Sequence, residues 1–253
     1  MSGHSKWATI KHKKGAADQA RGKLFAKLIR QVEVAAREGG GDTDMNPTLR
    51  TMYQKARDSS VPLDTIERAI KRGTGELEGV TYEQITYEGY GPAGVAVLIE
   101  VLTDNRNRTG SDIRNVFSKR GGSMAEPGAV AWQFERKGVI AVPTTIEEDD
   151  LMLAALEAGA EDISAEGETW QVTTGPSDLN AVRAALEDAG MTVESADLTM
   201  IPSTVITLDD VGTAKRVLQL IDAIEDHDDV QAVHANFDVS DEILAALGTA
   251  ITM

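Results

Sequence analysis

Residues 139–200 have the sequence VIAVPTTIEEDDLMLAALEAGAEDISAEGETWQVTTGPSDLNAVRAALEDAGMTVESADLTM, and this stretch decides the fold class. Short apolar runs alternate in it with two segments whose apolar residues recur every three or four positions. Such segments predict helices at 148–158 and 178–189, and strands at 139–142, 162–165, 169–174 and 192–200. The order strand, helix, strand, strand, helix, strand is that of a ferredoxin-like domain.

The chain on either side of this stretch predicts the rest of a second α/β domain. The preceding part has a helix that ends at Lys119 and strands at 84–88, 95–102 and 129–134. It lacks a final helix and strand, and the chain after residue 206 supplies both, with the strand at 230–237. We therefore expect a discontinuous α/β domain, residues 79–137 plus 206–253, interrupted by the ferredoxin-like domain at 138–205.

Residues 1–78 predict a basic domain of three amphipathic helices. The first runs through 19–37, Asn46 and Pro47 open the second, and Pro62 opens the third. The expected fold class is α+β: an N-terminal three-helix domain and two ferredoxin-like α/β domains, one inserted into the other.

Composition limits the kind of protein. The 253 residues include no cysteine, which excludes disulfides and thiolate metal sites and fits a reducing cytoplasm. No apolar run is long enough to span a membrane, and residues 1–20 lack the apolar middle of a signal peptide. We expect a soluble, cytoplasmic protein.

Charge is distributed unevenly along the chain. Residues 1–75 carry 15 Lys and Arg against 8 Asp and Glu, a net +7, whereas residues 138–253 carry 3 against 24, a net −21. The total of −16 therefore hides a basic N-terminal part that can attract phosphates and an acidic C-terminal part that repels them.

The most basic stretch is SGHSKWATIKHKKG at residues 2–15. Basic groups interleaved with one aromatic ring suit a polyanion with bases that can stack, although a solvated basic end is the alternative. The helix that follows places Lys23, Lys27, Arg30 and Arg37 on one stripe, away from its apolar residues. Candidate nucleic-acid contacts in these two segments are Lys6, Trp7, Lys11, His12, Lys13, Lys14, Lys23, Lys27 and Arg30.

The segment TDNRNRTG at 103–110 offers a second candidate contact. Arg106 and Arg108 precede a predicted helix, with Thr109 or Ser111 as its cap, and could grip phosphate there. The alternative is structural pairing with Asp104, with Asp112 or with another domain.

No sequence motif indicates an enzyme. GYGPAG at 89–94 matches G-x-G-x-x-G, but it leads into a strand and contains Pro92, so a turn between antiparallel strands is expected. The four histidines lack zinc-ligand spacing, and the acidic run 147–150 is explained by the start of a helix better than by Mg²⁺. We expect no catalytic residues, no metal and no cofactor.

Four segments resemble the YebC/PmpR family along most of the chain: SGHSKWATIKHKKGAAD (2–18), VPLDTIERAIKRG (61–73), YEGYGPAGVAVLIEVLTDNRNRT (87–109) and AVAWQFERKG (129–138). The resemblance implies three domains and a cytoplasmic DNA-binding transcriptional regulator. Similar proteins, including the mitochondrial translational activator of cytochrome oxidase, instead imply a ribosome-associated factor that relieves stalled translation. The segment SMAEPG at 123–128 departs from the family pattern.

Two classes of function remain open at this stage. The first is a non-enzymatic nucleic-acid-binding regulator whose partner is DNA, or rRNA or tRNA on the ribosome. The second is a protein-interaction scaffold whose acidic domains dock a basic partner. The sequence predicts no membrane partner and leaves the oligomeric state open, with a monomer among the possibilities.

Overall fold

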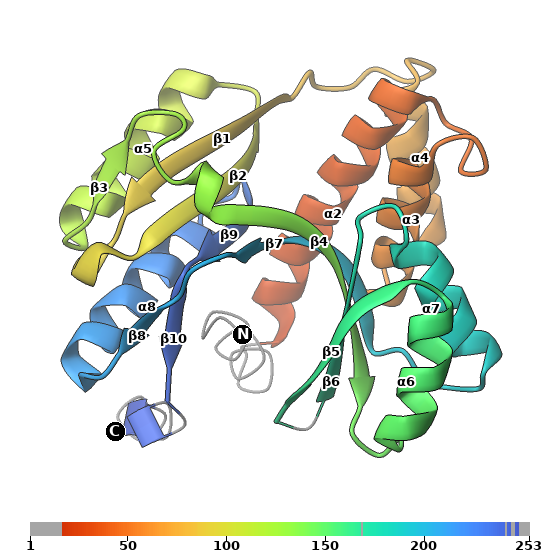
Figure 1. Cartoon of the computed structure of the whole chain (residues 1–253). Helices are drawn as coiled ribbons and strands as arrows, with labels where there is room; N and C mark the ends of the chain where they lie inside the picture. Colours follow the sequence, from red (N-terminus) through yellow and green to blue (C-terminus); the bar gives the residue numbers. More distant parts are fainter. Residues whose placement is uncertain (1–16, 168, 241, 244–245, 248–253) are drawn as a thin grey trace. The chain divides into compact units, whose positions relative to one another are not determined.

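The computed structural model describes residues 17–167, 169–240, 242–243 and 246–247 (Figure 1). The chain divides into two compact units by its internal contacts. The first unit comprises the described parts of residues 1–31, 78–135 and 202–253, and the second comprises 32–77 and 136–201. The predicted domain boundaries at 78, 137 and 205 stay a prediction.

The first unit contains the larger mixed core. Its four-stranded antiparallel sheet has the order β3-β1-β2-β9, formed by β1 (Glu83–Tyr90), β2 (Ala96–Thr103), β3 (Ser123–Ala125) and β9 (Val230–Ala235). Helices α5 (Arg106–Lys119) and α8 (Val211–Glu225) pack on it (Figure 1). The short strands β8 (Ile206–Leu208) and β10 (Phe237–Val239) form a parallel pair. The helix and strand after residue 206 therefore complete the segment before residue 137, as predicted.

Strand β2 explains why this sheet is stable. Val97, Ile99 and Val101 face α5 and α8 in the core, while Ala96 and Leu98 are buried on the other face. A central strand that is covered on both sides has a continuous apolar sequence. The GYGPAG segment is the turn between β1 and β2, with Tyr90 paired to Ala96, as the sequence indicated.

The second unit contains the ferredoxin-like segment. Its sheet has the order β5-β6-β4-β7, formed by β4 (Phe134–Pro143), β5 (Ala160–Glu166), β6 (Thr169–Thr174) and β7 (Ser195–Pro202). Helices α6 (Glu148–Glu157) and α7 (Leu179–Asp188) complete the predicted order βαββαβ. Leu151, Val172, Val182 and Leu186 are fully buried in its core.

Helices α2 (Ala17–Gly39), α3 (Pro47–Asp58) and α4 (Leu63–Gly73) match the three predicted helices. The Asn46 side chain caps α3 by accepting a hydrogen bond from the Leu49 N–H, as predicted. Gly73 does not cap α4 in the left-handed conformation. It instead allows α4 to lie against α2, because a Cβ there would collide with the Glu33 carbonyl.

Two details of the sequence prediction were wrong. The expected strand at 129–134 is a 3₁₀ turn, η2 (Ala131–Gln133), and Phe134 begins β4. Helix α5 is capped by Asn105, not by Thr109 or Ser111, so Arg106 and Arg108 lie in its first turn. On the predicted helix at 148–158, Leu151 is buried whereas Leu153 and Leu156 are exposed, a difference on which the sequence made no prediction.

Candidate nucleic-acid interface

Part of the predicted interface lies outside the described residues. Lys6, Trp7, Lys11, His12, Lys13 and Lys14 all precede Ala17, where the description begins. Their contact with nucleic acid stays a prediction that rests on the sequence.

The basic stripe of α2 faces the turn between α8 and β9. The Lys23 Nζ lies 2.6 Å from Asp226 Oδ1, and the Lys27 Nζ donates to the Glu225 carbonyl at 2.8 Å. The hydrogen bond to Asp226 raises the pKa of Lys23, whereas burial lowers the pKa of Lys27. Cations placed at the end of α8 also interact favourably with the helix dipole. Lys23 and Lys27 are thus engaged within the first unit, whereas Arg37, the fourth residue of the predicted stripe, pairs with Glu33 at 3.4 Å in the second unit.

Arg30, the third member of this stripe, contacts the buried carboxylate of Asp229. Its Nη1 lies 3.0 Å from Asp229 Oδ1, and its guanidinium lies 5.3 Å from the centre of the Tyr82 ring. Lys23, Lys27 and Arg30 therefore have structural partners, and their contact with nucleic acid stays a prediction.

Asp229 is the centre of a hydrogen-bond network that explains the TDNRNRT motif. Its Oδ2 accepts from Thr109 at 2.7 Å, from Thr103 at 3.1 Å and from Arg108 at 3.0 Å. Burial disfavours the charged carboxylate, but these donors and Arg30 outweigh it and lower the pKa of Asp229 to about 2. The network fastens the β2–α5 connection to the start of β9.

Arg108 is part of this network. It pairs with Asp104 at 2.8 Å as well as with Asp229, which is the structural alternative that the sequence left open. Arg106 has a different environment, because its side chain is exposed and makes no ion pair with a residue that the structure describes.

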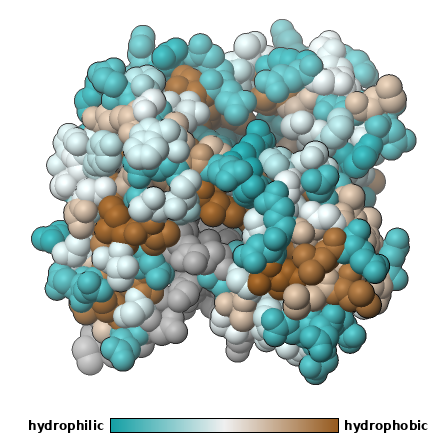
Figure 2. All heavy atoms as spheres, viewed as in Figure 1, coloured by the Kyte–Doolittle hydropathy of each residue, from teal (hydrophilic) through white to brown (hydrophobic). Residues whose placement is uncertain are grey.

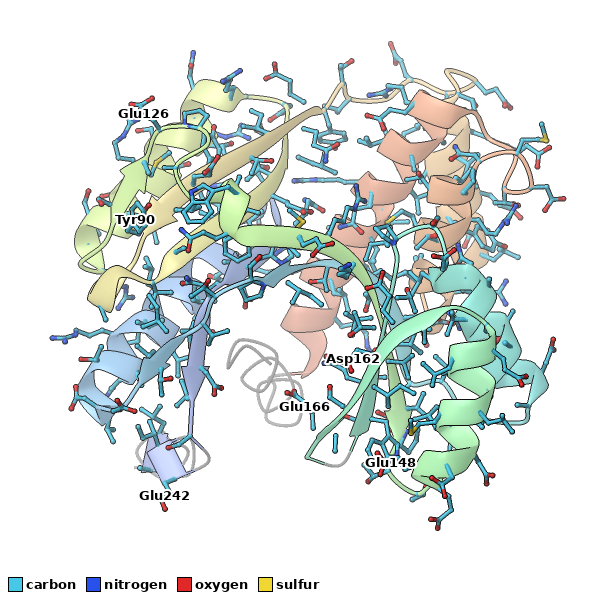
Figure 3. The ribbon with its side chains drawn as sticks, in the orientation of Figure 1. Tyr90, Glu126, Glu148, Asp162, Glu166 and Glu242 are labelled. Atoms are coloured by element: carbon cyan, nitrogen blue, oxygen red, sulfur yellow. The ribbon has the colours of Figure 1, made fainter. Side chains whose placement is uncertain are left out.

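Arg106 lines a groove of about 430 Å³ between α5, β1 and the segment after β3. Arg114 lines the same groove, two helical turns further along α5. Tyr87 lies between these two arginines and packs against Gly110. A Cβ atom added to Gly110 would lie 3.1 Å from the Tyr87 hydroxyl oxygen. The hydroxyl donates to the Arg106 carbonyl at 3.1 Å. Glu126 also lines this groove, at the position labelled in Figure 3.

Helix α5 and its C-cap residue carry three cations that the sequence analysis did not single out: Arg114, Lys119 and Arg120. Residues 106–120 contain five Lys and Arg against one Asp, in a chain with a net charge of −16. Arg114, Lys119 and Arg120 are exposed and make no ion pair with a described residue. A charge count over the predicted helix would have found them.

The loop that continues from this groove presents an exposed tryptophan. The carboxylate of Glu88 accepts hydrogen bonds from the N–H groups of Gly128, Val130 and Ala131 at 2.6, 2.6 and 2.9 Å. Burial disfavours its charge, but the three N–H groups outweigh this and lower the pKa of Glu88. These hydrogen bonds also explain why residues 129–134 do not form a strand. The N–H groups of Val130 and Ala131 already donate to Glu88, so they cannot pair with a neighbouring strand.

Trp132 follows this fastened loop and is 75% exposed. Its indole N–H donates to the Ala129 carbonyl at 3.0 Å, and the Tyr90 hydroxyl donates to the same oxygen at 3.1 Å. The indole ring therefore has its polar group satisfied while its apolar surface faces solvent. The sequence around Trp132, AVAWQFERKG, gave no indication that this side chain would be exposed.

Two further properties concern the described residues alone. In the part of the chain that the structure describes, no group of three or more His, Asp or Glu side chains is arranged to hold a metal ion. None of the described helices combines the length and apolar character needed to cross a membrane.

The fold defines an α+β protein in which two four-stranded antiparallel sheets each carry two helices. Family models then identify it. Residues 5–76 match the model described as TACO1/YebC protein N-terminal domain, and residues 82–237 match TACO1/YebC second and third domain. The chain belongs to the TACO1/YebC family, which confirms the resemblance seen in the sequence.

Similar proteins agree with this assignment. A protein of Halothermothrix orenii is 57% identical over 96% of this chain and 98% of its own length, and one of Rubrobacter xylanophilus is 59% identical over 97% and 98%. Both are named probable transcriptional regulatory protein. The crystal structure of a conserved hypothetical protein from Aquifex aeolicus superposes with a TM-score of 0.85 at 47% identity, covering 94% of this chain and 99% of that one.

Proposed function

We propose that this protein is a non-enzymatic, nucleic-acid-binding regulator of gene expression. The names of its relatives support a role in transcription and therefore DNA as the target. The observation that carries the proposal is the combination, on the first unit, of exposed α5 cations with an exposed aromatic ring at Trp132. Cations bind the phosphate backbone and an aromatic face stacks on a base.

In this proposal, Arg106 and Arg114 contact successive phosphates along the groove, and the basic N-terminal stretch adds further phosphate contacts. Lys23, Lys27, Arg30 and Arg108 hold α2, α5 and the α8–β9 turn together within the first unit, and their predicted contact with phosphate is secondary to this role. Trp132 favours RNA as a second candidate target, because a base must be unstacked before a side chain can stack on it. Ribosomal RNA satisfies that condition more readily than duplex DNA.

The test measures the affinity of the full chain for duplex DNA and for single-stranded RNA over a range of salt concentrations. The double variant R106Q/R114Q removes two phosphate contacts, so the slope of log K against log salt should become shallower by about 1.8 for duplex and about 1.4 for single strands. The matched control K215Q/R216Q removes two exposed charges from α8, and we expect its slope to equal that of the unmodified chain. Equal slopes for both variants would overturn the groove as the interface.

Two additional variants divide the interface. K11E/K13E/K14E tests the N-terminal stretch and should abolish binding while the melting temperature stays unchanged. W132A should weaken single-stranded RNA by about 1–3 kcal/mol and leave duplex DNA nearly unaffected if stacking is the contact. Sedimentation with ribosomes separates the two targets, because a DNA regulator should be missing from ribosome fractions.

A further inference from the structure

Helix α6 in the second unit has apolar side chains on two opposite faces. Leu151 and Ala155 are fully buried in the core, whereas Met152, Leu153 and Leu156 are 40%, 65% and 47% exposed. The three exposed residues are neighbours on the outer face, because positions three and four apart lie on the same side of a helix. Figure 2 shows apolar atoms at the surface in the region where Figure 1 draws α6.

Carboxylates lie at both ends of this apolar face, four at the start of α6 and one at its end. Residues 144–160 contain five Asp and Glu and no Lys, Arg or His. Each of the five side chains is exposed, and none forms an ion pair with a described residue: Glu147, Glu148, Asp149, Asp150 and Glu157. Glu148 lies at the start of α6 (Figure 3).

The requirements of the helix itself explain part of this pattern. Acidic residues in the first turn of α6 interact favourably with the helix dipole. Glu157 lies at the opposite end of α6, where a negative charge interacts unfavourably with the helix dipole. Leu153 and Leu156 are also not required for the stability of α6, because they face solvent and not the core. An apolar patch rimmed by charges of one sign is instead typical of a docking surface.

The five carboxylates determine which kind of partner can bind this apolar face. A second copy of this chain would bring five more carboxylates against these five, and nucleic acid or an anionic lipid surface would be repelled for the same reason. A segment with apolar residues on one side and Lys or Arg at the margins complements both features. We propose that the outer face of α6 docks a basic amphipathic helix of another protein.

In the docked state, apolar side chains of the partner cover Met152, Leu153 and Leu156, and its cations face Asp149, Asp150 and Glu157. The surface is a single helix face, so the interaction belongs to the small, transient class. It is separate from the proposed nucleic-acid interface, which lies on the first unit, and the two can be tested independently.

The test uses a fluorescent synthetic helical peptide with Leu on one face and Lys on the other, and a matched peptide in which Glu replaces Lys. L153S/L156S changes two side chains that already face solvent, so the fold should persist, with an unchanged melting curve as the check. We expect this variant to weaken binding of the Lys peptide by about tenfold or more. D149N/D150N should weaken it several-fold and reduce its dependence on salt.

The control D188N/E194Q removes two exposed carboxylates elsewhere in the second unit, and its affinity should stay within about twofold of the unmodified chain. The proposal is overturned if the control loses as much affinity as D149N/D150N, since the attraction is then general. Equal binding of the Glu peptide, or a dimer that L153S/L156S dissociates, would also overturn it. Nucleic-acid affinity of L153S/L156S should be unchanged whichever result is obtained.

Discussion

Helices α2 and α5 both carry cations that the sequence assigned to nucleic acid, and α5 carries further ones such as Arg114, yet the two helices use them differently. On α2, Lys23, Lys27 and Arg30 all contact the α8–β9 turn, through Asp226, the Glu225 carbonyl and Asp229. On α5, Arg106 and Arg114 remain exposed beside a groove. A basic stripe in the sequence therefore shows where positive charge lies. The segment that packs against the stripe, here the α8–β9 turn, decides whether that charge is available to a ligand.

That partner segment is distant in the sequence. Asp226 and Asp229 follow Lys23 and Arg30 by about 200 residues, so no local pattern connects them. Arg108 shows the same effect, because one of its two carboxylate partners is local and the other is Asp229. The comparison of α2 with α5 leads to four predictions, ordered by the size of the expected effect on stability.

The largest effect should follow from loss of Asp229. D229A leaves Thr103 and Thr109 without their buried acceptor and leaves Arg30 and Arg108 without a shared carboxylate. We expect the free energy of unfolding to fall by about 3 kcal/mol, measured by urea denaturation. The control D228A removes an exposed carboxylate from the same turn and should change stability by less than about 0.5 kcal/mol. Equal losses in the two variants would contradict the network.

Acid should produce the next largest effect. The pKa of Asp229 is lowered from 3.8 to about 2 in the folded protein, so its stabilising contribution is complete above pH 4. That contribution is lost as the pH falls from about 4 towards 2, and it amounts to roughly 2 kcal/mol. Denaturation midpoints measured across this range should fall less steeply for D229A than for the unmodified chain. Parallel curves would contradict the assigned pKa.

The sequence predicted local features well and long-range partners poorly. The strands, the helices and the completion of the first sheet by β9 follow from periodicity and turn residues. The 3₁₀ turn at Ala131–Gln133 could not be predicted, because a carboxylate on a distant strand, Glu88, takes the backbone donors that a sheet would need. The exposure of Leu153 on α6 has the same origin, since periodicity identifies apolar residues without showing which face packs.

Glu88 should have a smaller effect than Asp229. E88Q keeps the shape of the side chain but removes the charge that three backbone N–H groups share, so we expect a loss of about 1–2 kcal/mol. Amide hydrogen exchange at Gly128, Val130 and Ala131 should accelerate. Because the loop also holds Trp132, a shift of tryptophan fluorescence is expected. Unchanged exchange at these three amides would show that other contacts hold the loop.

The smallest effects on stability separate the two helices directly. K23Q removes a partly exposed ion pair on α2 and should cost up to about 1 kcal/mol. R106Q/R114Q removes two charges that pair with no described residue, so stability should change by less than about 0.5 kcal/mol. If the α5 charges are free for a ligand and those of α2 are structural, K23Q alters unfolding and R106Q/R114Q alters the salt dependence of nucleic-acid binding. The opposite pattern would mean that the α2 stripe, despite its partners, is the surface that meets phosphate.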